Sequence, residues 1–155
     1  MPSGSTLLAQ EHQVRRSGSG LDAKALEGCW HLQCVWPRSA TEPKATTNRL
    51  LRALNARLEL SAVNESALVI SNAVNLGALE LRFRGSAELR GRRPLLQFQF
   101  DTLTLALGGL RLLHRKLPAP AEQRKPFFAL IARDPSGWLA ARGRGGGLAL
   151  WRLKD

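Results

Sequence analysis

The cysteines and histidines are the side chains best suited to catalysis or metal binding, yet their spacing favours neither role. Cys29 and Cys34 lie five positions apart, an odd offset that places them on opposite faces of a strand. His31 shares a face with Cys29, whereas His12 and His114 lie far away in the sequence. Because no set has metal-ligand spacing, we expect free thiols in a reducing compartment, with no metal and no cofactor.

The sequence also lacks common nucleophile and phosphate-binding motifs. It has few carboxylates and no Gly-x-Ser-x-Gly nucleophile elbow. A phosphate-binding loop needs glycines between a strand and a helix, whereas the glycine-rich segment 143–147 precedes LALWRL, whose alternation is typical of a strand. We therefore predict a non-enzymatic protein.

Large apolar side chains carry the clearest functional pattern. Trp30 and Trp36 share one face of a predicted strand, and two further strands place leucine and phenylalanine on matching faces. We predict that these faces turn inward and line one interior, which either fills with side chains or leaves a slot for a long apolar ligand. The predicted lining residues are Trp30, Leu32, Cys34, Trp36, Leu81, Phe83, Phe98 and Phe100.

The charge balance points to an anionic partner. Lys and Arg number 23 against 12 Asp and Glu, which gives a formal net charge of +11. Such a surface attracts nucleic acid, anionic lipid or acidic protein. A GC-rich coding sequence would also favour Arg over Lys, although it leaves the shortage of acidic residues unexplained.

The elements that must position these residues are mostly strands. Alternation with a period of two is clearest in segment 78–90, where leucine and phenylalanine alternate with charged residues. Gly85 interrupts its apolar face, and parity reverses in the next strand after Asp101, which requires a bulge or corner. Leucine spacing predicts a helix from Asn48 to about Arg57. The predicted strands cover 28–36, 58–63, 67–74, 78–90, 96–107, 110–114, 127–133, 138–142 and 148–153.

Together these elements predict a mainly β fold, an antiparallel barrel of lipocalin-like type with about eight or nine strands and one short early helix. A chain of 155 residues has room for one such domain. We assign residues 1–20 to a flexible N-terminal tail, because Ser17 to Gly20 has the composition of a flexible joint, and residues 21–155 to the barrel. We expect neither a secretory leader nor a transmembrane segment, because no suitable apolar run occurs.

A motif near the start of the predicted barrel carries a first resemblance. Residues 26–32 read Leu-x-Gly-x-Trp-x-Leu, with Gly28 and Trp30 at its centre. The central Gly28-x-Trp30 resembles the entry of lipocalin-type barrels, in which a basic residue near the end of the barrel packs on the Trp. Arg142 and Arg152 are the candidates for that cation–π contact.

Two end motifs resemble the fibrillin, or plastid lipid-associated protein, family. The run Leu26-x-Gly28-x-Trp30-x-Leu32 is similar to the first strand of that family, and the segment GWLAARGRGGGLALWR is similar to its final hairpin. In that hairpin a strand ending in Arg-Gly is followed by glycines and an apolar last strand. The matching positions are Arg142, Gly143, Gly147, Leu148 and Leu150. The family's Tyr-Leu-Asp segment is missing, since this chain contains no Tyr, so the resemblance is to a compact, divergent member of cyanobacterial type.

This resemblance implies a barrel that binds a lipid or isoprenoid, such as a fatty acid, quinone or carotenoid. It also implies association with anionic, thylakoid-type membranes or lipid globules, and hence a location in the cytoplasm or on the periphery of the thylakoid membrane. The residues expected to close the barrel and to face an anionic surface are Gly28, Arg142, Arg144 and Arg152.

Two alternative functions stay open at this point. A small basic barrel can bind nucleic acid, but the predicted outer face of segment 78–90 lacks aromatic residues that stack on bases, so we expect only weak, charge-driven binding. The other alternative is a carrier or lyase for a tetrapyrrole or bilin on the same fold. It would need a reactive Cys, His or Arg side chain in the pocket, and only Cys34 meets that requirement.

Overall fold

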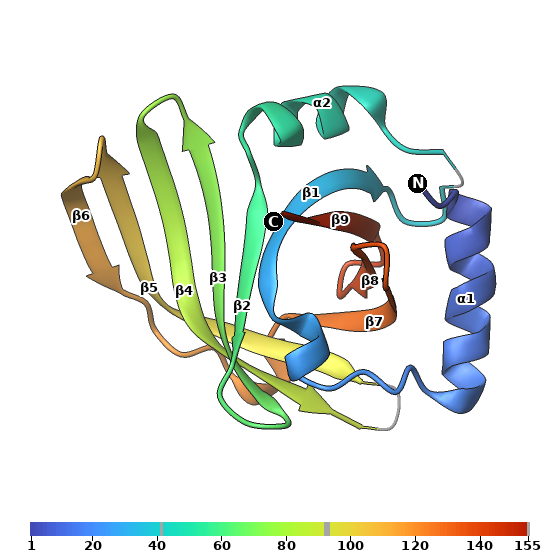
Figure 1. Ribbon diagram of the computed structural model, residues 1–155. Coiled ribbons are helices and arrows are strands. Elements are labelled where there is room, and N and C mark those ends of the chain that lie inside the picture. Colours follow the sequence, from blue (N-terminus) through green and yellow to red (C-terminus); the bar gives the residue numbers. More distant parts are fainter. Residues whose placement is uncertain (41, 92–93, 155) are drawn as a thin grey trace.

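Strands account for most of the regular structure in the computed structural model, which describes residues 1–40, 42–91 and 94–154 (Figure 1). Within those residues, nine strands are accompanied by two α-helices and two short 3-10 helices. The helices are α1 (Gly4–Ser17), η1 (Lys24–Leu26), α2 (Ala45–Ala53) and η2 (Glu122–Arg124). The strands are β1 (Gly28–Trp36), β2 (Arg57–Ala62), β3 (Ala67–Leu76), β4 (Leu79–Arg90), β5 (Leu95–Leu107), β6 (Leu110–Lys116), β7 (Phe127–Asp134), β8 (Trp138–Gly143) and β9 (Leu148–Lys154). The predicted mainly β class is confirmed.

Eight of the strands form a closed antiparallel barrel. In order of pairing they are β1, β2, β3, β4, β5, β7, β8 and β9, and β9 pairs back with β1. β5 has 13 residues, so one of its edges pairs with β4 while the other pairs first with β7 and then with β6. β6 therefore lies outside the closed barrel. The predicted antiparallel barrel of eight or nine strands is confirmed.

The outer halves of β3, β4 and β5 continue beyond the barrel and form, together with β6, a four-stranded extension of the sheet (Figure 1, left). The extension begins at the change of parity predicted after Asp101. Arg84 pairs with Thr102 and Gly85 pairs with Phe100, which leaves Asp101 as the extra residue of a β-bulge. The bulge allows β5 to leave the barrel while its apolar side chains stay on one face.

A central core fills the barrel. Its fully buried side chains include Leu26, Trp30, Ile70 and Leu96. The indole N–H of Trp30 donates to the carbonyl oxygen of Leu26 at 2.8 Å, so burial leaves this polar atom satisfied. Through this contact η1 packs against the barrel interior.

The N-terminal segment is helical, so the expectation of a flexible tail is wrong for residues 4–17. Ser3 caps α1 by accepting a hydrogen bond from the N–H of Thr6 at 3.2 Å, and Gly18 ends the helix with a φ of 78°. The helix runs along the outside of the barrel (Figure 1), where Leu7 is buried in a second apolar cluster. The capping residues are a local signal for a helix. The surface on which α1 packs, however, forms only when distant strands pair, so the sequence pattern does not show that the segment is docked.

α2 begins and ends earlier than the leucine spacing predicts. The predicted helix began at Asn48 and continued into β2, whereas α2 covers Ala45–Ala53. Its buried side chain is Asn48, whose amide oxygen accepts from the N–H of Val35 at 2.8 Å and whose amide nitrogen contacts the Cys34 sulfur at 3.2 Å. Leu50 is 59% exposed. A polar anchor thus joins α2 to β1, which apolar periodicity does not predict.

Candidate functional site

The eight predicted lining residues occupy three different environments. Four belong to the central core or pack against it, two lie on the extension of the sheet, and two lie in the outer apolar cluster beneath α1. The core set is Trp30, Leu32, Phe98 and Phe100, the extension pair is Leu81 and Phe83, and the outer pair is Cys34 and Trp36. These residues therefore do not line a single slot.

A β-bulge in β1 explains the outer pair. The register of β1 against β9 shifts between Leu32 and Cys34, so Gln33 is an extra residue. Side chains after the bulge point outward, where they pack with Leu7 of α1. The prediction that Cys34 and Trp36 line the interior is wrong, because the bulge reverses the alternation on which it was based.

A row of aromatic rings joins the core to the extension. The ring centroids are 5.3 Å apart between Trp151 and Phe128, 5.1 Å between Phe128 and Phe98, 5.4 Å between Phe98 and Phe100, and 5.5 Å between Phe100 and Phe83. Such spacings are typical of packed aromatic pairs. The barrel core and one face of the extension therefore form a single apolar surface.

This face of the extension is mostly apolar across three rows of neighbouring residues. Residues that pair directly across antiparallel strands point to the same side of the sheet. The outer row is Leu76, Leu79, Leu107 and Leu110, the middle row is Val74, Leu81, Leu105 and Leu113, and the inner row is Asn72, Phe83, Leu103 and Arg115. We call these twelve positions the open face. Leu81, Phe83 and Leu105 are half-buried, so solvent reaches part of their apolar surface.

The sequence-based site contained Leu81 and Phe83 but missed their partners on β5. Leu103 pairs with Phe83, and Leu105 pairs with Leu81. The parity reversal after Asp101 is the signal that could have identified them, because it returns Leu103 and Leu105 to the apolar side.

The opposite face of the sheet carries a network of four charged side chains from β2 and β4. Arg57 donates to Glu80 (Nη2–Oε2, 2.7 Å), as does Arg82 (Nε–Oε1, 2.9 Å), and Arg82 also pairs with Glu59. Hydrogen bonds from Arg82 lower the pKa of Glu59 and of Glu80, against a smaller opposing effect of burial. Since these charges pair with one another, this face presents a polar surface without unpaired carboxylates in the network.

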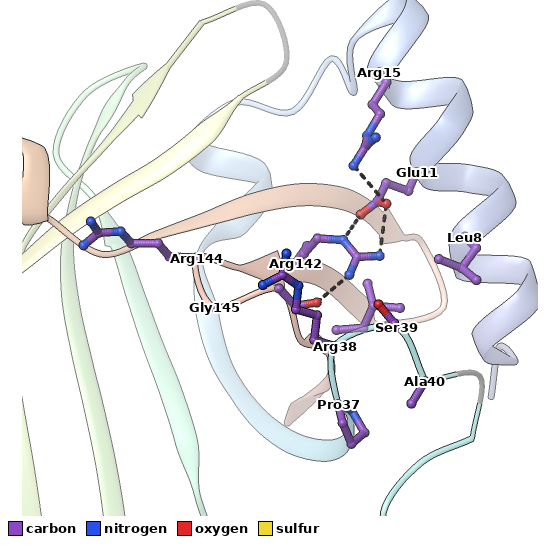
Figure 2. Close-up of a pocket in the computed structure, with 12 residues that line it drawn as sticks. Leu8, Glu11, Arg15, Pro37, Arg38, Ser39, Ala40, Arg142, Arg144 and Gly145 are labelled. Atoms are coloured by element: carbon purple, nitrogen blue, oxygen red, sulfur yellow. Dashed lines mark hydrogen bonds and ion pairs between the residues drawn. The ribbon is translucent and has the colours of Figure 1, made fainter.

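A cleft of about 450 Å³ lies between α1, the loop after β1 and the β8–β9 turn (Figure 2). The Arg142 guanidinium donates two hydrogen bonds to the Glu11 carboxylate (Nε–Oε2, 2.6 Å; Nη2–Oε1, 3.0 Å) and one to the carbonyl of Gly146 at 2.6 Å. Arg15 contacts the same carboxylate at 3.4 Å, and the Glu11 side chain is only 7% exposed. Because Glu11 and Arg142 are paired, the main role of this arrangement is to hold α1 against the barrel.

The cation on Trp30 comes from a residue that sequence reasoning missed. The Arg133 guanidinium carbon lies 5.4 Å from the ring centroid of Trp30. Of the two predicted candidates, Arg152 instead lies 5.5 Å over Trp138, and Arg142 binds Glu11 as described above. The expected contact to Trp30 is therefore made by β7, which no pattern in the sequence distinguishes from the other arginine-bearing strands.

The remaining two predicted positions, Gly28 and Arg144, have structural roles. Gly28 has a φ of 137°, a backbone conformation that residues with a side chain rarely adopt, and a Cβ atom there would displace the Leu153 side chain, whose Cδ1 it would approach to 2.4 Å, so glycine is strongly favoured. Arg144 points away from the cleft (Figure 2) and donates to the carbonyls of Gln123 and Arg124 at 3.0 and 2.7 Å. Arg142 and Arg144 are thus both engaged within the protein.

Cys29 and His31 lie together on the outer side of β1, with Sγ and Nε2 3.5 Å apart. Burial raises the pKa of the Cys29 thiol and lowers the pKa of His31, so both are neutral at about pH 7. Such a pair is no thiolate–imidazolium nucleophile. Among the residues that the structure describes, no three or more His, Cys, Asp or Glu side chains gather as possible metal ligands. Within the same ranges, no helix has the length and apolar character that crossing a bilayer requires.

Comparison with protein-family models found no matching family, and comparison with curated proteins found no match. The resemblance to the fibrillin family therefore stays a prediction from the two end motifs.

Proposed function

We propose that the protein is a non-enzymatic barrel that binds a long apolar ligand, of the fatty acid, quinone or carotenoid class, on the open face. The observation that carries this proposal is the continuity between the packed aromatic row and the half-buried leucines beyond it. Phe100 packs against the core, and Phe83, 5.5 Å away, belongs to the open face. Because Trp30 and its neighbours fill the barrel centre, the ligand lies at the mouth of the barrel rather than in an enclosed slot.

The extent of the open face supports this proposal. Rows of one face are two residues apart along a strand, or about 7 Å, and strands are about 4.8 Å apart, so three rows over four strands span roughly 14 by 14 Å. The largest contiguous apolar patch of a monomer is often a functional surface. Only Asn72 and Arg115, both in the inner row, are polar.

Charge and resemblance support the choice of a membrane setting. The net charge of +11 favours peripheral association with an anionic membrane. The resemblance carried by Gly28, Trp30 and Arg142 suggests that this membrane is of thylakoid type or the surface of a lipid globule, with the protein in the cytoplasm or on the periphery of the thylakoid membrane. We propose that nucleic acid binds only weakly, through charge.

Titration with a dansyl-labelled fatty acid, in solution and without vesicles, tests this function. We expect saturable binding, and we expect Leu105→Glu to weaken it by at least about tenfold, because it places a charge within the apolar rows. The matched control is Thr102→Glu, on the opposite face of the same strand between Arg84 and Lys116, which should leave the affinity unchanged. Competition by unlabelled fatty acid, quinone and carotenoid then ranks the ligand classes.

Absence of saturable binding, or an equal loss in both variants, would contradict the proposal. Thermal unfolding of each variant by circular dichroism separates loss of binding from loss of fold.

A further inference from the structure

The tips of two β-hairpins lie side by side at the far end of the extension (Figure 1). Leu79 in the β3–β4 hairpin pairs with Leu107 in the β5–β6 hairpin, and the N–H of Gly108 donates to the carbonyl of Ala78 at 3.0 Å. The tips therefore form one continuous edge, which we call the rim.

The rim exposes large apolar side chains to solvent. Leu76 is 70% exposed, Leu107 49%, Leu110 68% and Leu112, the bulged residue of β6, 52%. All seven residues of β6 are exposed. Since hairpin tips are commonly polar, four exposed leucines at this edge point to an apolar partner.

Basic side chains surround these leucines. β6 carries Arg111, Arg115 and Lys116 and no acidic residue. In the described parts of the chain, none of the ion pairs involves these three residues. The acidic residue nearest in sequence to β6, Glu122, pairs instead with Arg90 and Lys125. Glu80 lies in the same row as Arg111, two strands away, and is bound by Arg57 and Arg82.

Exposed leucines beside unpaired cations match the interface of an anionic bilayer, where apolar groups enter the acyl boundary and cations meet headgroup phosphates. A second copy of the chain fits less well, because pairing two β6 strands would place three cations against three. Nucleic acid also fits less well, because the rim offers no aromatic ring for base stacking.

We propose that the rim docks on an anionic lipid bilayer, with Leu76, Leu107 and Leu110 inserted and Arg111 and Arg115 among the headgroups. This inference rests on the proposed function, since docking through the rim brings the outer row of the open face to the membrane from which a lipid ligand would enter. It goes further by naming the element that touches the membrane.

Flotation of the full chain with phosphatidylcholine vesicles, with and without phosphatidylglycerol, tests the apolar part of the rim. We expect binding to the anionic vesicles, and Leu110→Glu should weaken it by roughly tenfold or more. The control is Val63→Glu, because Val63 is 66% exposed but lies at the other end of β3, and it should reduce binding far less. Equal losses in the two variants, or equal binding to neutral and anionic vesicles, would overturn the proposal.

Two double variants that lower the net charge by the same amount test the basic part of the rim. Arg111→Gln with Arg115→Gln should weaken vesicle binding and reduce its dependence on salt, whereas Arg16→Gln with Lys24→Gln, on exposed positions of α1 and η1, should have a much smaller effect. Equal effects of the two pairs would show that only the overall charge matters and would contradict docking through the rim.

Insertion has its own readout. Brominated acyl chains in anionic vesicles should quench the fluorescence of the tryptophan introduced by Leu110→Trp, and they should not quench that of the tryptophan introduced by Val63→Trp. If Leu110→Trp is not quenched, or if vesicle binding is absent while duplex DNA is retained at physiological salt, the inference is wrong. Leu112→Glu changes the exposed leucine of the rim that lies outside the twelve positions of the open face. It is expected to weaken vesicle binding and to keep the dansyl fatty acid affinity in solution, so loss of vesicle binding alone tests docking, and absence of fatty acid binding in the wild type tests only the proposed function.

Discussion

Gly85 lies where β4 passes from the barrel into the extension, and its lack of a side chain lets two strands approach closely. A Cβ atom at this position would lie 1.8 Å from the carbonyl oxygen of Gln99 and 2.8 Å from the Cα of Phe100. These are backbone atoms, which cannot move aside as a flexible side chain could. Glycine is therefore required for the bend at the Asp101 bulge.

The Gly85→Ala variant should lose roughly 2–3 kcal/mol of unfolding free energy, as expected when atoms are forced into a packed backbone contact. Urea denaturation followed by circular dichroism measures the change. Ser86→Ala is the control, because Ser86 is exposed on the next position and should change stability by less than about 0.5 kcal/mol. An unchanged midpoint for Gly85→Ala would contradict the close approach of β4 and β5.

At the scale of elements, α1 depends on one ion pair for its position. Glu11 is nearly buried and takes two hydrogen bonds from Arg142 of β8. Leu7 adds an apolar contact one turn earlier in the outer cluster. The short polar helix would be marginal in isolation, so this docking stabilises it.

The Glu11→Gln variant should release α1 and lower the unfolding free energy by about 2 kcal/mol. This is less than the 3–5 kcal/mol typical of a fully buried pair, because the Arg142 side chain is 21% exposed. Trypsin cleavage after Arg15 and Arg16 is the more direct measurement, and we expect it to become faster. His12→Gln, at an exposed neighbouring position, should cleave as the wild type does, and a wild-type rate for Glu11→Gln would refute the clamp.

At the scale of the whole molecule, the charged network on β2 and β4 lies on the outer face where the barrel continues into the extension. Arg57 of β2 reaches across β3 to Glu80 of β4, and Arg82 of β4 reaches back across β3 to Glu59 of β2. On the other side of the same sheet, the open face is apolar. One sheet thus combines a paired, polar outer surface with an apolar surface that the proposed ligand and membrane would cover.

The network predicts a loss of stability in acid. Because the pKa values of Glu59 and Glu80 are lower in the folded protein than the usual value of about 4.3 in an unfolded chain, their contribution is full above about pH 5 and is lost as the pH falls through the lowered values. With the two side chains 36% and 30% exposed, we expect at most about 1 kcal/mol from each.

Thermal unfolding at about pH 7 and about pH 3 measures this effect. The variant Glu59→Gln with Glu80→Gln should be less stable than the wild type at the higher pH and lose less stability on acidification. The control pair Glu27→Gln with Glu65→Gln, at exposed positions outside the network, should follow the wild-type curve. A double variant with the full wild-type acid response would show that the network contributes nothing.

The class of fold and most of the strands could be predicted from the amino-acid sequence. Alternation in segment 78–90 predicted β4, and the reversal after Asp101 predicted the bulge that the register of β4 and β5 confirms. These features are local, because the side-chain period of a strand and its turn residues are encoded within a few positions.

Which apolar faces are interior depends on contacts between distant strands and could not be predicted from the sequence. The residues from Trp30 to Trp36 alternate without interruption in the sequence, yet Gln33 forms a bulge because β9 and the docked α1 together provide apolar surfaces on both sides of β1. Likewise, Leu81 and Phe83 have the pattern of core residues, but they lie on the open face because β5 leaves the barrel there to pair with β6. Alternation specifies that one side of a strand is apolar, and the pairing of distant strands determines what that side faces.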